Sequence, residues 1–288
     1  MGLCYPDTRS VWDAYLGGNS FRKTLLIGHQ QLFLHRSEIA FFTQASGKEL
    51  HSMAAYSFGD YADGFLRELL GIEQLSVMDF SDYEGADLIH DLNFPVPDHL
   101  VSQFDAVIDA GTLEHVFNFP VAIANLMKMT KVGGRIFIAT PANNQCGHGF
   151  YQFSPELMFR IFSDANGFEI DRVSMYEADY PSIELSENHI VYDVIDPAAV
   201  GSRVGIVSAK PVTMIVEAVK TADVPPFEAP PLQSDYVATW EDGDAAKKAE
   251  SAAKRIARKL GFLTYAIGHR EKSKYSFSNR RFYKRREL

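Results

Sequence analysis

Cysteine is scarce in this sequence, and long hydrophobic runs are absent. The two cysteines, Cys4 and Cys146, are too few and too far apart to predict a disulfide framework, so a reducing compartment, the cytoplasm, is expected. No apolar run reaches the roughly 18 residues that a membrane-spanning helix needs. The first residues do not combine a basic segment with an apolar one. We therefore expect neither a transmembrane segment nor a secretory signal.

The charge of the chain is unevenly distributed. The 288 residues are 46% hydrophobic, which is enough for one domain with a full core and an appendage. The net charge is −9, yet the segment from Glu241 onward contains fourteen Lys and Arg against six Asp and Glu. Such a basic tail is typical of a chain that binds an acidic partner, a nucleic acid or an anionic membrane. The alternative is a solvated helix that packs on the acidic body of its own chain or of a second subunit.

Residues 104–155 have the pattern of a βαβ unit. Residues 106–108 form a short apolar run, as in a buried parallel strand. The apolar residues of 120–130 recur at helical spacing, and a Gly-Gly pair at 133–134 predicts the end of that helix. Residues 135–140 predict a second strand. The unit implies a parallel sheet with a right-handed crossover.

Polar residues gather where these two strands are expected to end. Ligands of parallel α/β sheets bind beyond the carboxyl ends of the strands. The loop after the second strand is fixed at its far end by Ser154 and Pro155, a favourable helix start. The residues expected at this rim are Asp109, Gly111, Glu114, His115, Asn143, Asn144, His148 and Tyr151.

Further elements are predicted on both sides of this unit. Residues 23–27 and 75–78 have strand patterns, which Gly28 and Asp79 follow. An acidic residue after the second strand of a nucleotide-binding sheet accepts hydrogen bonds from ribose hydroxyls. The remaining expectations are helices at 37–44, 61–70, 156–165 and 244–260, an inserted helical region at about 32–72, and late strands at 169–178 and 211–219.

The pattern FDxVxxxGxLEHV, followed by a helix and KxGGRxxIxTPxNN, resembles the class I S-adenosylmethionine-dependent methyltransferases. The resemblance covers about residues 23–168 and is strongest over 104–168. It implies an α/β, Rossmann-like doubly wound fold, with a seven-stranded, mostly parallel sheet closed by a C-terminal antiparallel hairpin. Residues 1–222 are then a methyltransferase-like domain, and residues 223–288 are a proline-rich linker and a basic, helical C-terminal extension.

The resemblance also implies S-adenosylmethionine as the cofactor. In the family, the loop after the first strand commonly carries three glycines, whereas here Gly28 is followed by His29, Gln30 and Gln31. Either the two glutamine side chains contact the amino-acid end of the cofactor, or the site has lost it. An acidic residue near position 91 lies by the adenine amino group in the family. The predicted cofactor-binding residues are Gly28, Gln30, Asp79, Asp91, Asp109 and Gly111.

Acid–base or substrate-positioning roles are predicted for His148, Tyr151 and His115, because imidazole titrates near neutral pH. For His115 the alternative is a helix-start histidine bonded to a backbone carbonyl. No metal site is predicted, since Cys146 and His148 are closely spaced and lack further partners. The sequence does not show whether Asp109, His115 and His148 converge in space.

The sequence therefore predicts an enzyme that transfers a methyl group to O, N or C of a small molecule or saccharide. PANNQ, at residues 141–145, differs from the Asn/Asp-Pro-Pro-aromatic motif of enzymes that methylate nucleic-acid amino groups, which disfavours a nucleic-acid substrate. The alternative is a catalytically inactive binding or scaffold protein with the same fold. A nicotinamide-linked oxidoreductase is disfavoured because the GxGxxG turn is absent.

Overall fold

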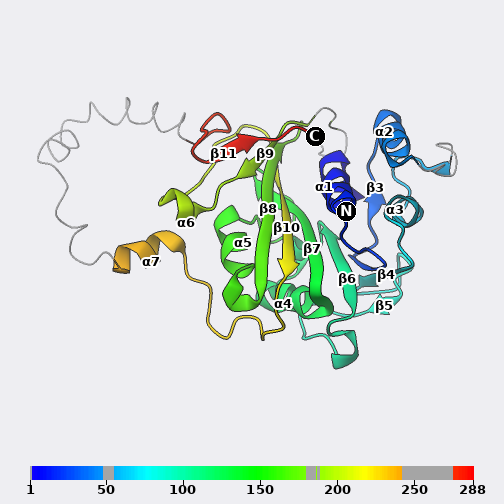
Figure 1. Cartoon of the computed structure of the whole chain (residues 1–288), viewed down its shortest axis with the longest axis horizontal. Coiled ribbons are helices and arrows are strands. Elements are labelled where there is room, and N and C mark those ends of the chain that lie inside the picture. Colours follow the sequence, from blue (N-terminus) through cyan, green and yellow to red (C-terminus); the bar gives the residue numbers. More distant parts are fainter. Residues whose placement is uncertain (1, 48–54, 180–185, 187–188, 242–274) are drawn as a thin grey trace, which may run out of the picture.

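A computed structural model describes residues 2–47, 55–179, 186, 189–241 and 275–288 of the chain. Figure 1 shows the elements in space. In chain order they are β1 (Gly2–Leu3), α1 (Tyr5–Leu16), β2 (Lys23–Ile27), β3 (Gln31–Leu32), α2 (Arg36–Ser46), α3 (Asp63–Leu70), β4 (Gln74–Asp79), β5 (Leu88–Ile89), the 3-10 helix η2 (Asp98–Leu100), β6 (Phe104–Ala110), the 3-10 helix η3 (Leu113–His115), α4 (Phe119–Met129), β7 (Thr130–Asn143), α5 (Pro155–Ile161), the 3-10 helix η4 (Asp164–Asn166), β8 (Phe168–Glu177), β9 (Val191–Val194), α6 (Pro197–Val200), β10 (Val212–Lys220), α7 (Ser234–Glu241) and β11 (Tyr283–Arg285).

The main sheet has the strand order β11-β9-β8-β10-β7-β6-β2-β4-β5. Strands β5, β4, β2, β6 and β7 run parallel to one another, whereas β10 runs antiparallel to both β7 and β8. The chain leaves β2 toward β4 and β5, and then returns to form β6 on the other side of β2. The strand order therefore reverses between β2 and β6, which is where ligands of such sheets bind.

The α/β, doubly wound fold predicted from the sequence is confirmed, including the antiparallel closure by β8 and β10. The sheet is wider than the seven strands expected, because β9 pairs with β8 and β11 pairs with β9. Strand β9 comes from the segment between the two late strands, and β11 comes from the C-terminal residues. A separate two-stranded parallel sheet, β1 with β3, lies outside it.

Two hydrophobic cores lie on opposite faces of the main sheet. Helices α1, α2 and α3 cover one face with Trp12, Phe42 and Phe65, which pack against Leu26 and Ile108 of the strands. Helices α4 and α5 cover the other face, where the core includes the side chains of Leu126, Met158, Val107 and Ile136. Alternate residues of β6 thus enter opposite cores, as the pleat of a strand requires. The result is a three-layer arrangement (Figure 1).

One predicted boundary is wrong: α4 ends at Met129, and the glycine pair at 133–134 lies inside β7. The helix stops early because its last carbonyls bind elsewhere, those of Lys128 and Met129 accepting the backbone N–H groups of Ser102 and Gln103. The glycines instead allow close strand pairing. A Cβ on Gly134 would lie 2.9 Å from the carbonyl oxygen of Asp105.

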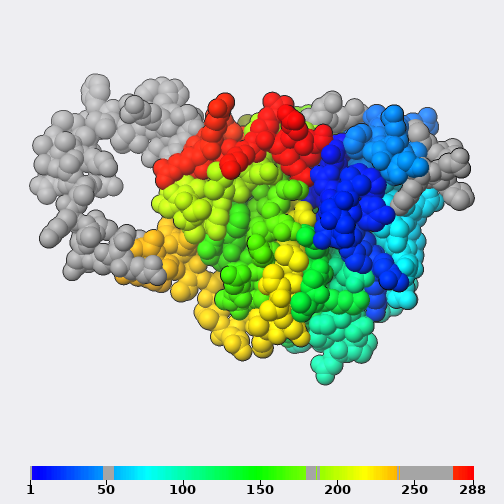
Figure 2. Space-filling model, viewed as in Figure 1, coloured from blue at the N-terminus to red at the C-terminus, as the bar shows by residue number. Residues whose placement is uncertain are grey.

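The C-terminal residues return to the body of the protein. The last residues, red in Figure 2, lie beside the blue N-terminal helix, and Arg286 forms an ion pair with Asp13 of α1. A basic residue near the end of the chain thus pairs with an acidic residue of the body, whereas the helical alternative for the tail stays a prediction. The helix expected at 244–260 lies outside the described residues. Within the described part of the chain, no helix has the length and hydropathy to cross a membrane.

Candidate functional site

The carboxyl ends of β2 and β6 are joined directly. Gly28 follows β2 with φ 72° and Gly111 follows β6 with φ 105°, conformations that suit glycine because it lacks a Cβ. Thr112 Oγ1 donates a hydrogen bond of 2.8 Å to the carbonyl oxygen of Ile27. Both glycines are buried. The structure thus places Gly28 and Gly111 together at the point where the strand order reverses.

Asp109, the penultimate residue of β6, is buried and organises the turn that follows. Its carboxylate accepts the backbone N–H of Thr112 at 2.8 Å and that of Leu113 at 3.3 Å. Burial, and to a smaller extent the charge of Glu114, raise the pKa of the Asp109 carboxyl to about 8. Among the described residues no Lys or Arg forms an ion pair with Asp109 or Glu114, so no cationic side chain compensates these two buried carboxyl groups.

The segment after β2 is held by its side chains. Gln30 is fully buried, and its Nε2 donates to the carbonyl of Ile27 while its Oε1 has no hydrogen-bond donor. The ring of His29 stacks on Tyr61 at 3.6 Å between centroids, and its Nε2 lies 3.0 Å from Asp63. Gln30 therefore lies at the rim with one unsatisfied acceptor, and its predicted contact with the cofactor stays a prediction.

The two acidic residues assigned to the nucleoside lie on neighbouring loops. Asp79, at the end of β4, is partly exposed and accepts the N–H of Phe80 at 2.5 Å. Asp91 follows β5, and its Oδ1 accepts two hydrogen bonds from Asn93. Asn93 in turn accepts the backbone N–H of Asn118, which joins this loop to the one after η3. The cofactor roles of Asp79 and Asp91 also stay predictions.

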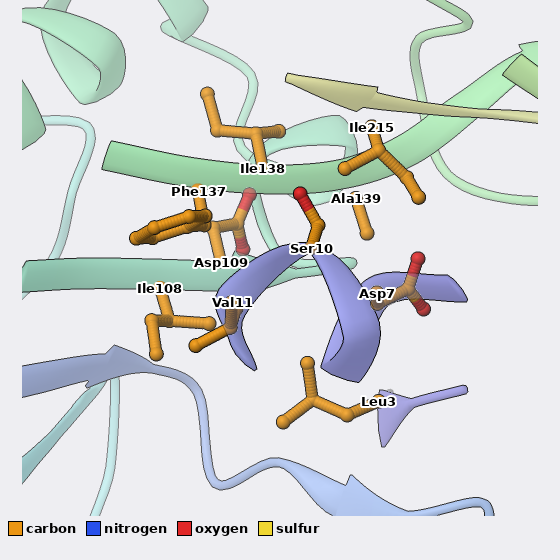
Figure 3. Close-up of a pocket in the computed structure, with 10 residues that line it drawn as sticks. All are labelled: Leu3, Asp7, Ser10, Val11, Ile108, Asp109, Phe137, Ile138, Ala139 and Ile215. Atoms are coloured by element: carbon orange, nitrogen blue, oxygen red, sulfur yellow. The ribbon is translucent and has the colours of Figure 1, made fainter. Parts of the chain in front are cut away.

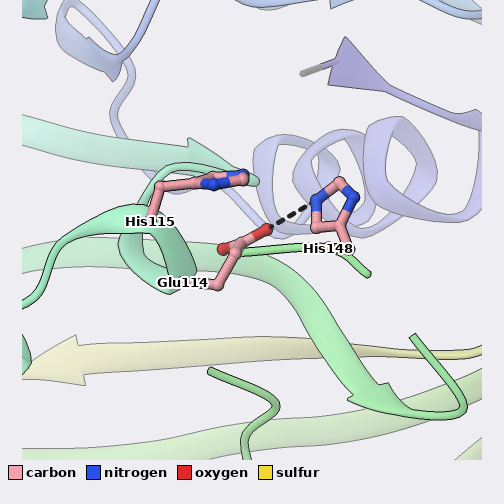
Figure 4. A group of neighbouring side chains, drawn as sticks. All are labelled: Glu114, His115 and His148. Carbon is pink, nitrogen blue, oxygen red and sulfur yellow. Dashed lines mark ion pairs between the residues drawn. The ribbon is translucent and has the colours of Figure 1, made fainter. Parts of the chain in front are cut away.

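Glu114, His115 and His148 form a cluster on the same rim (Figure 4). Glu114 is fully buried, and its Oε1 lies 3.3 Å from Nε2 of His148. The rings of His115 and His148 are 5.1 Å apart between centroids. Burial lowers the pKa of His115 below its usual value, against the opposing charge of Glu114. The structure therefore brings both predicted histidines together, with Glu114 as the shared carboxylate.

Tyr151 joins the loops that follow β6 and β7. Its hydroxyl donates a hydrogen bond of 2.7 Å to the carbonyl of Phe117, and its backbone N–H donates to the carbonyl of Glu114. These contacts fix the position of the loop that carries His148. The Tyr151 hydroxyl is thus bonded to the backbone, and the acid–base role of Tyr151 stays a prediction.

A small cavity lies between α1 and the sheet, next to Asp109 (Figure 3). Burial raises the pKa of Asp7, on α1, to about 7. Asp7 accepts the N–H of Cys4 at 3.0 Å and faces the hydroxyl of Tyr176 at 3.3 Å. Ser10 Oγ has no hydrogen-bond partner among the described residues. The cavity is lined by Leu3, Asp7, Ser10, Val11, Ile108, Asp109, Phe137, Ile138, Ala139 and Ile215.

Exposed aromatic side chains follow the carboxyl ends of four strands in the parallel part of the sheet. Phe80 and Tyr83 follow β4, Phe94 follows β5, Phe117 follows β6 and η3, and Phe150 follows β7. Each is exposed by more than half, and the rings of Phe117 and Phe150 meet edge to face at 6.2 Å. Aromatic surface at the loops of one rim is typical of a ligand-binding region.

Three contributors to this region were given no catalytic or binding role from the sequence, although Glu114 was expected at the rim. Glu114 is fully buried, and Thr140 Oγ1 donates a hydrogen bond of 3.1 Å to its Oε2. Asp7 and Ser10 line the cavity beside Asp109 because α1 packs on the sheet. Sequence spacing carries no signal for either contact.

Comparisons with known proteins give structural likeness only. No protein-family model matches the chain, and no curated protein sequence matches it. The N-methyltransferase NodS from Bradyrhizobium japonicum, solved with S-adenosyl-L-homocysteine, shares 12% identity over 75% of this chain and 89% of its own, with a TM-score of 0.39. A SAM-dependent methyltransferase from Archaeoglobus fulgidus shares 12% identity over 75% of this chain and 94% of its own, with a TM-score of 0.38.

A third similar structure belongs to an enzyme with a different named activity. The branched-chain polyamine synthase from Thermus thermophilus, solved with N4-aminopropylspermidine and 5'-methylthioadenosine, shares 14% identity over 80% of this chain and 59% of its own, with a TM-score of 0.37. Because these TM-scores are below 0.5 and these identities below 25%, the likenesses do not by themselves assign a function to this chain.

Proposed function

We propose that this chain binds S-adenosylmethionine at the rim formed by the loops after β2, β4, β5 and β6, and transfers its methyl group to O, N or C of a small molecule or saccharide. The observation that carries the proposal is the set of acidic side chains at the carboxyl ends of β4, β5 and β6. Asp79 is the last residue of β4, Asp91 follows β5, and Asp109 is the penultimate residue of β6. The resemblance of residues 104–168 to class I methyltransferases supports it.

The residues present fit this cofactor. S-adenosylmethionine carries a positive sulfonium and a positive ammonium group, and the buried carboxyls of Asp109 and Glu114 have no Lys or Arg partner among the described residues. A cation beside them offsets their mutual repulsion. The buried Oε1 of Gln30 offers an acceptor to an ammonium group. Asp79 supplies an acceptor-only carboxylate for two ribose hydroxyls.

Methyl transfer from S-adenosylmethionine requires few catalytic groups from the protein. The sulfonium supplies an activated methyl group when the cofactor is bound, so the protein mainly aligns the acceptor and accepts its proton. His115 and His148 lie on the same rim as Asp109 and carry imidazoles for that proton. The aromatic side chains of Phe117 and Phe150 provide apolar surface against which an acceptor packs.

A binding or scaffold protein is the second candidate, and one observation favours it. His29 stacks on Tyr61 and contacts Asp63 on one side and the carbonyl of Glu84 on the other. This bridge occupies the segment that carries bare glycines in the methyltransferase family. A chain of this kind uses the rim for contacts without methyl transfer.

Calorimetric titration of the full chain with S-adenosylmethionine and S-adenosylhomocysteine separates the two candidates. The enzyme is expected to bind both ligands with a dissociation constant below about 1 mM, the upper range of enzyme substrates. Absence of heat at millimolar ligand, with a cooperative thermal unfolding curve to show that the chain is folded, contradicts methyl transfer and favours the scaffold.

A further inference from the structure

The cluster of Glu114, His115 and His148 has the composition of a metal site. Its three candidate ligand atoms, one from each side chain, all lie within 4.8 Å of one another. Glu114 and His115 come from η3, and His148 comes from the loop after β7. Glu114 is buried while both histidines are exposed. Figure 4 shows the three side chains and the ion pair of Glu114 with His148.

The carboxylate of Glu114 is aimed into this cluster with unused acceptor capacity. Its Oε2 accepts a hydrogen bond from Thr140, whereas its Oε1 has no hydrogen-bond donor and points toward His148. A fully buried carboxylate is costly unless a cation or further donors compensate it. No Lys or Arg of the described residues forms an ion pair with it. A bound cation supplies that compensation.

The backbone holds His148 against Glu114. The carbonyl oxygen of Glu114 accepts the N–H groups of Phe150 at 2.8 Å and Tyr151 at 3.2 Å. Gly149, which separates His148 from Phe150, has φ +72°. A Cβ at this position would lie 2.8 Å from the carbonyl oxygen of Glu114. Two segments distant in sequence are therefore locked together directly beside the three side chains, as a preformed ligand set requires.

We propose that Glu114, His115 and His148 bind a divalent transition-metal ion. Two imidazoles and one carboxylate suit zinc, iron(II) or manganese(II), and disfavour calcium and magnesium, which prefer oxygen ligands alone. Ligand atoms about 2.0–2.1 Å from a tetrahedral ion lie about 3.3–3.4 Å apart, and Glu114 Oε1 lies 3.3 Å from His148 Nε2. The exposed imidazole of His115 closes the remaining distance by side-chain rotation.

Three protein ligands leave a coordination position open. A catalytic use of this open position rests on the methyl transfer proposed above. With the ion bound, His115 and His148 act as ligands in place of the proton-accepting role considered above. An acceptor hydroxyl that binds the ion then loses its proton to solvent, because the ion lowers the pKa of bound oxygen groups. The oxygen then bonds to the methyl carbon as the carbon–sulfur bond breaks, which leaves S-adenosylhomocysteine. The metal site thus points to a hydroxyl as the acceptor.

The test measures metal binding without any methyl donor. Tag-free full-length protein is stripped with a chelator and titrated with Zn²⁺, Mn²⁺ and Co²⁺ by calorimetry, with the visible absorption of Co²⁺ recorded in parallel. One ion per chain is expected for at least one metal. His148→Ala and Glu114→Gln are each expected to lower its affinity by at least about tenfold. His99→Ala removes an exposed histidine elsewhere and is expected to change nothing.

Thermal unfolding of each variant shows whether it is folded, and His148→Ala changes a side chain that is 46% exposed, so it tests the site without disturbing the core. The proposal is overturned if the wild type binds no ion stoichiometrically, or if folded His148→Ala binds as tightly as the wild type. Metal binding without any binding of S-adenosylmethionine supports the metal site and contradicts its use in methyl transfer.

Discussion

Thr112 Oγ1 lies 2.8 Å from the carbonyl oxygen of Ile27 and donates a hydrogen bond to it. The same carbonyl also accepts the side-chain N–H of Gln30. Two donors from different loops therefore meet at the last residue of β2, where the strand order reverses. This contact fixes the loop after β6 against the loop after β2, and so sets the spacing of the groups proposed to hold the cofactor.

Thr112→Val is expected to lower the free energy of unfolding by about 1 kcal/mol, because the variant loses a hydrogen bond but retains the volume of the side chain. Thr112→Ser retains the hydroxyl and is expected to lose less. Urea denaturation of the three proteins measures the difference. Equal stability of the valine and serine variants would show that the bond to Ile27 contributes nothing.

Asp79→Ala is expected to weaken binding of S-adenosylhomocysteine by about 1–3 kcal/mol, because it removes charge-assisted hydrogen bonds to the ribose. This corresponds to about 5- to 150-fold in the dissociation constant. Asp82→Ala removes a carboxylate from the exposed loop that follows and is the matched control. Calorimetry measures both affinities. If the two folded variants bind alike, Asp79 is not a ribose ligand.

Gly149→Ala is expected to destabilise the protein by about 1–2 kcal/mol or more, since alanine is disfavoured in the left-handed region. The added Cβ also approaches the carbonyl of Glu114 to 2.8 Å. Gly147→Ala is the control, because no atom lies within 4 Å of the Cβ it adds. Thermal unfolding measures the midpoints of the two variants. Equal midpoints would contradict the close packing of the loop at Gly149 against Glu114.

Asp7 makes the stability depend on pH. The unfolded chain ionises this carboxyl near pH 3.8, whereas burial raises its pKa to about 7 in the folded state. Between these pH values the folded protein binds more protons than the unfolded chain. The contribution of Asp7 to the free energy of unfolding therefore falls as pH rises, by up to about 1.4 kcal/mol per pH unit. The contribution is complete below pH 3.8 and lost above pH 7.

Asp7→Asn removes this dependence, since the amide does not ionise in this range. We expect the variant to gain stability relative to the wild type as pH rises from 5 to about 7. Urea denaturation at several pH values gives the two profiles. Parallel profiles over this range would mean that Asp7 ionises alike in the folded and unfolded chains.

Much of the fold could be predicted from local sequence patterns, such as apolar runs and helix-capping residues. The apolar runs at residues 23–27 and 106–108 are strands because their side chains enter both cores, and the Ser154 hydroxyl caps α5 by accepting the N–H of Leu157. The end of α4 was misplaced because its terminal carbonyls bind Ser102 and Gln103. Those partners are set by tertiary packing, which a glycine pair does not reveal.

The candidate site was less accessible from the sequence. The histidines and acidic residues at strand ends were identified because parallel strands bring their carboxyl ends to one rim. The pairing of Glu114 with His148, in place of Asp109, depends on the register that Gly149 allows between two loops. The stacking of His29 on Tyr61 depends on the path of the backbone through the inserted region at about residues 32–72. Neither contact has a periodicity or spacing signature.

A crystal structure of the full chain with S-adenosylhomocysteine tests the central claim most directly. We expect the ribose hydroxyls within hydrogen-bond distance, about 3 Å, of the Asp79 carboxylate, with the adenine beside Asp91 and the sulfur facing Asp109. A ligand bound away from these three residues, or a rim unchanged and without ligand in crystals grown at millimolar concentration, would contradict the account.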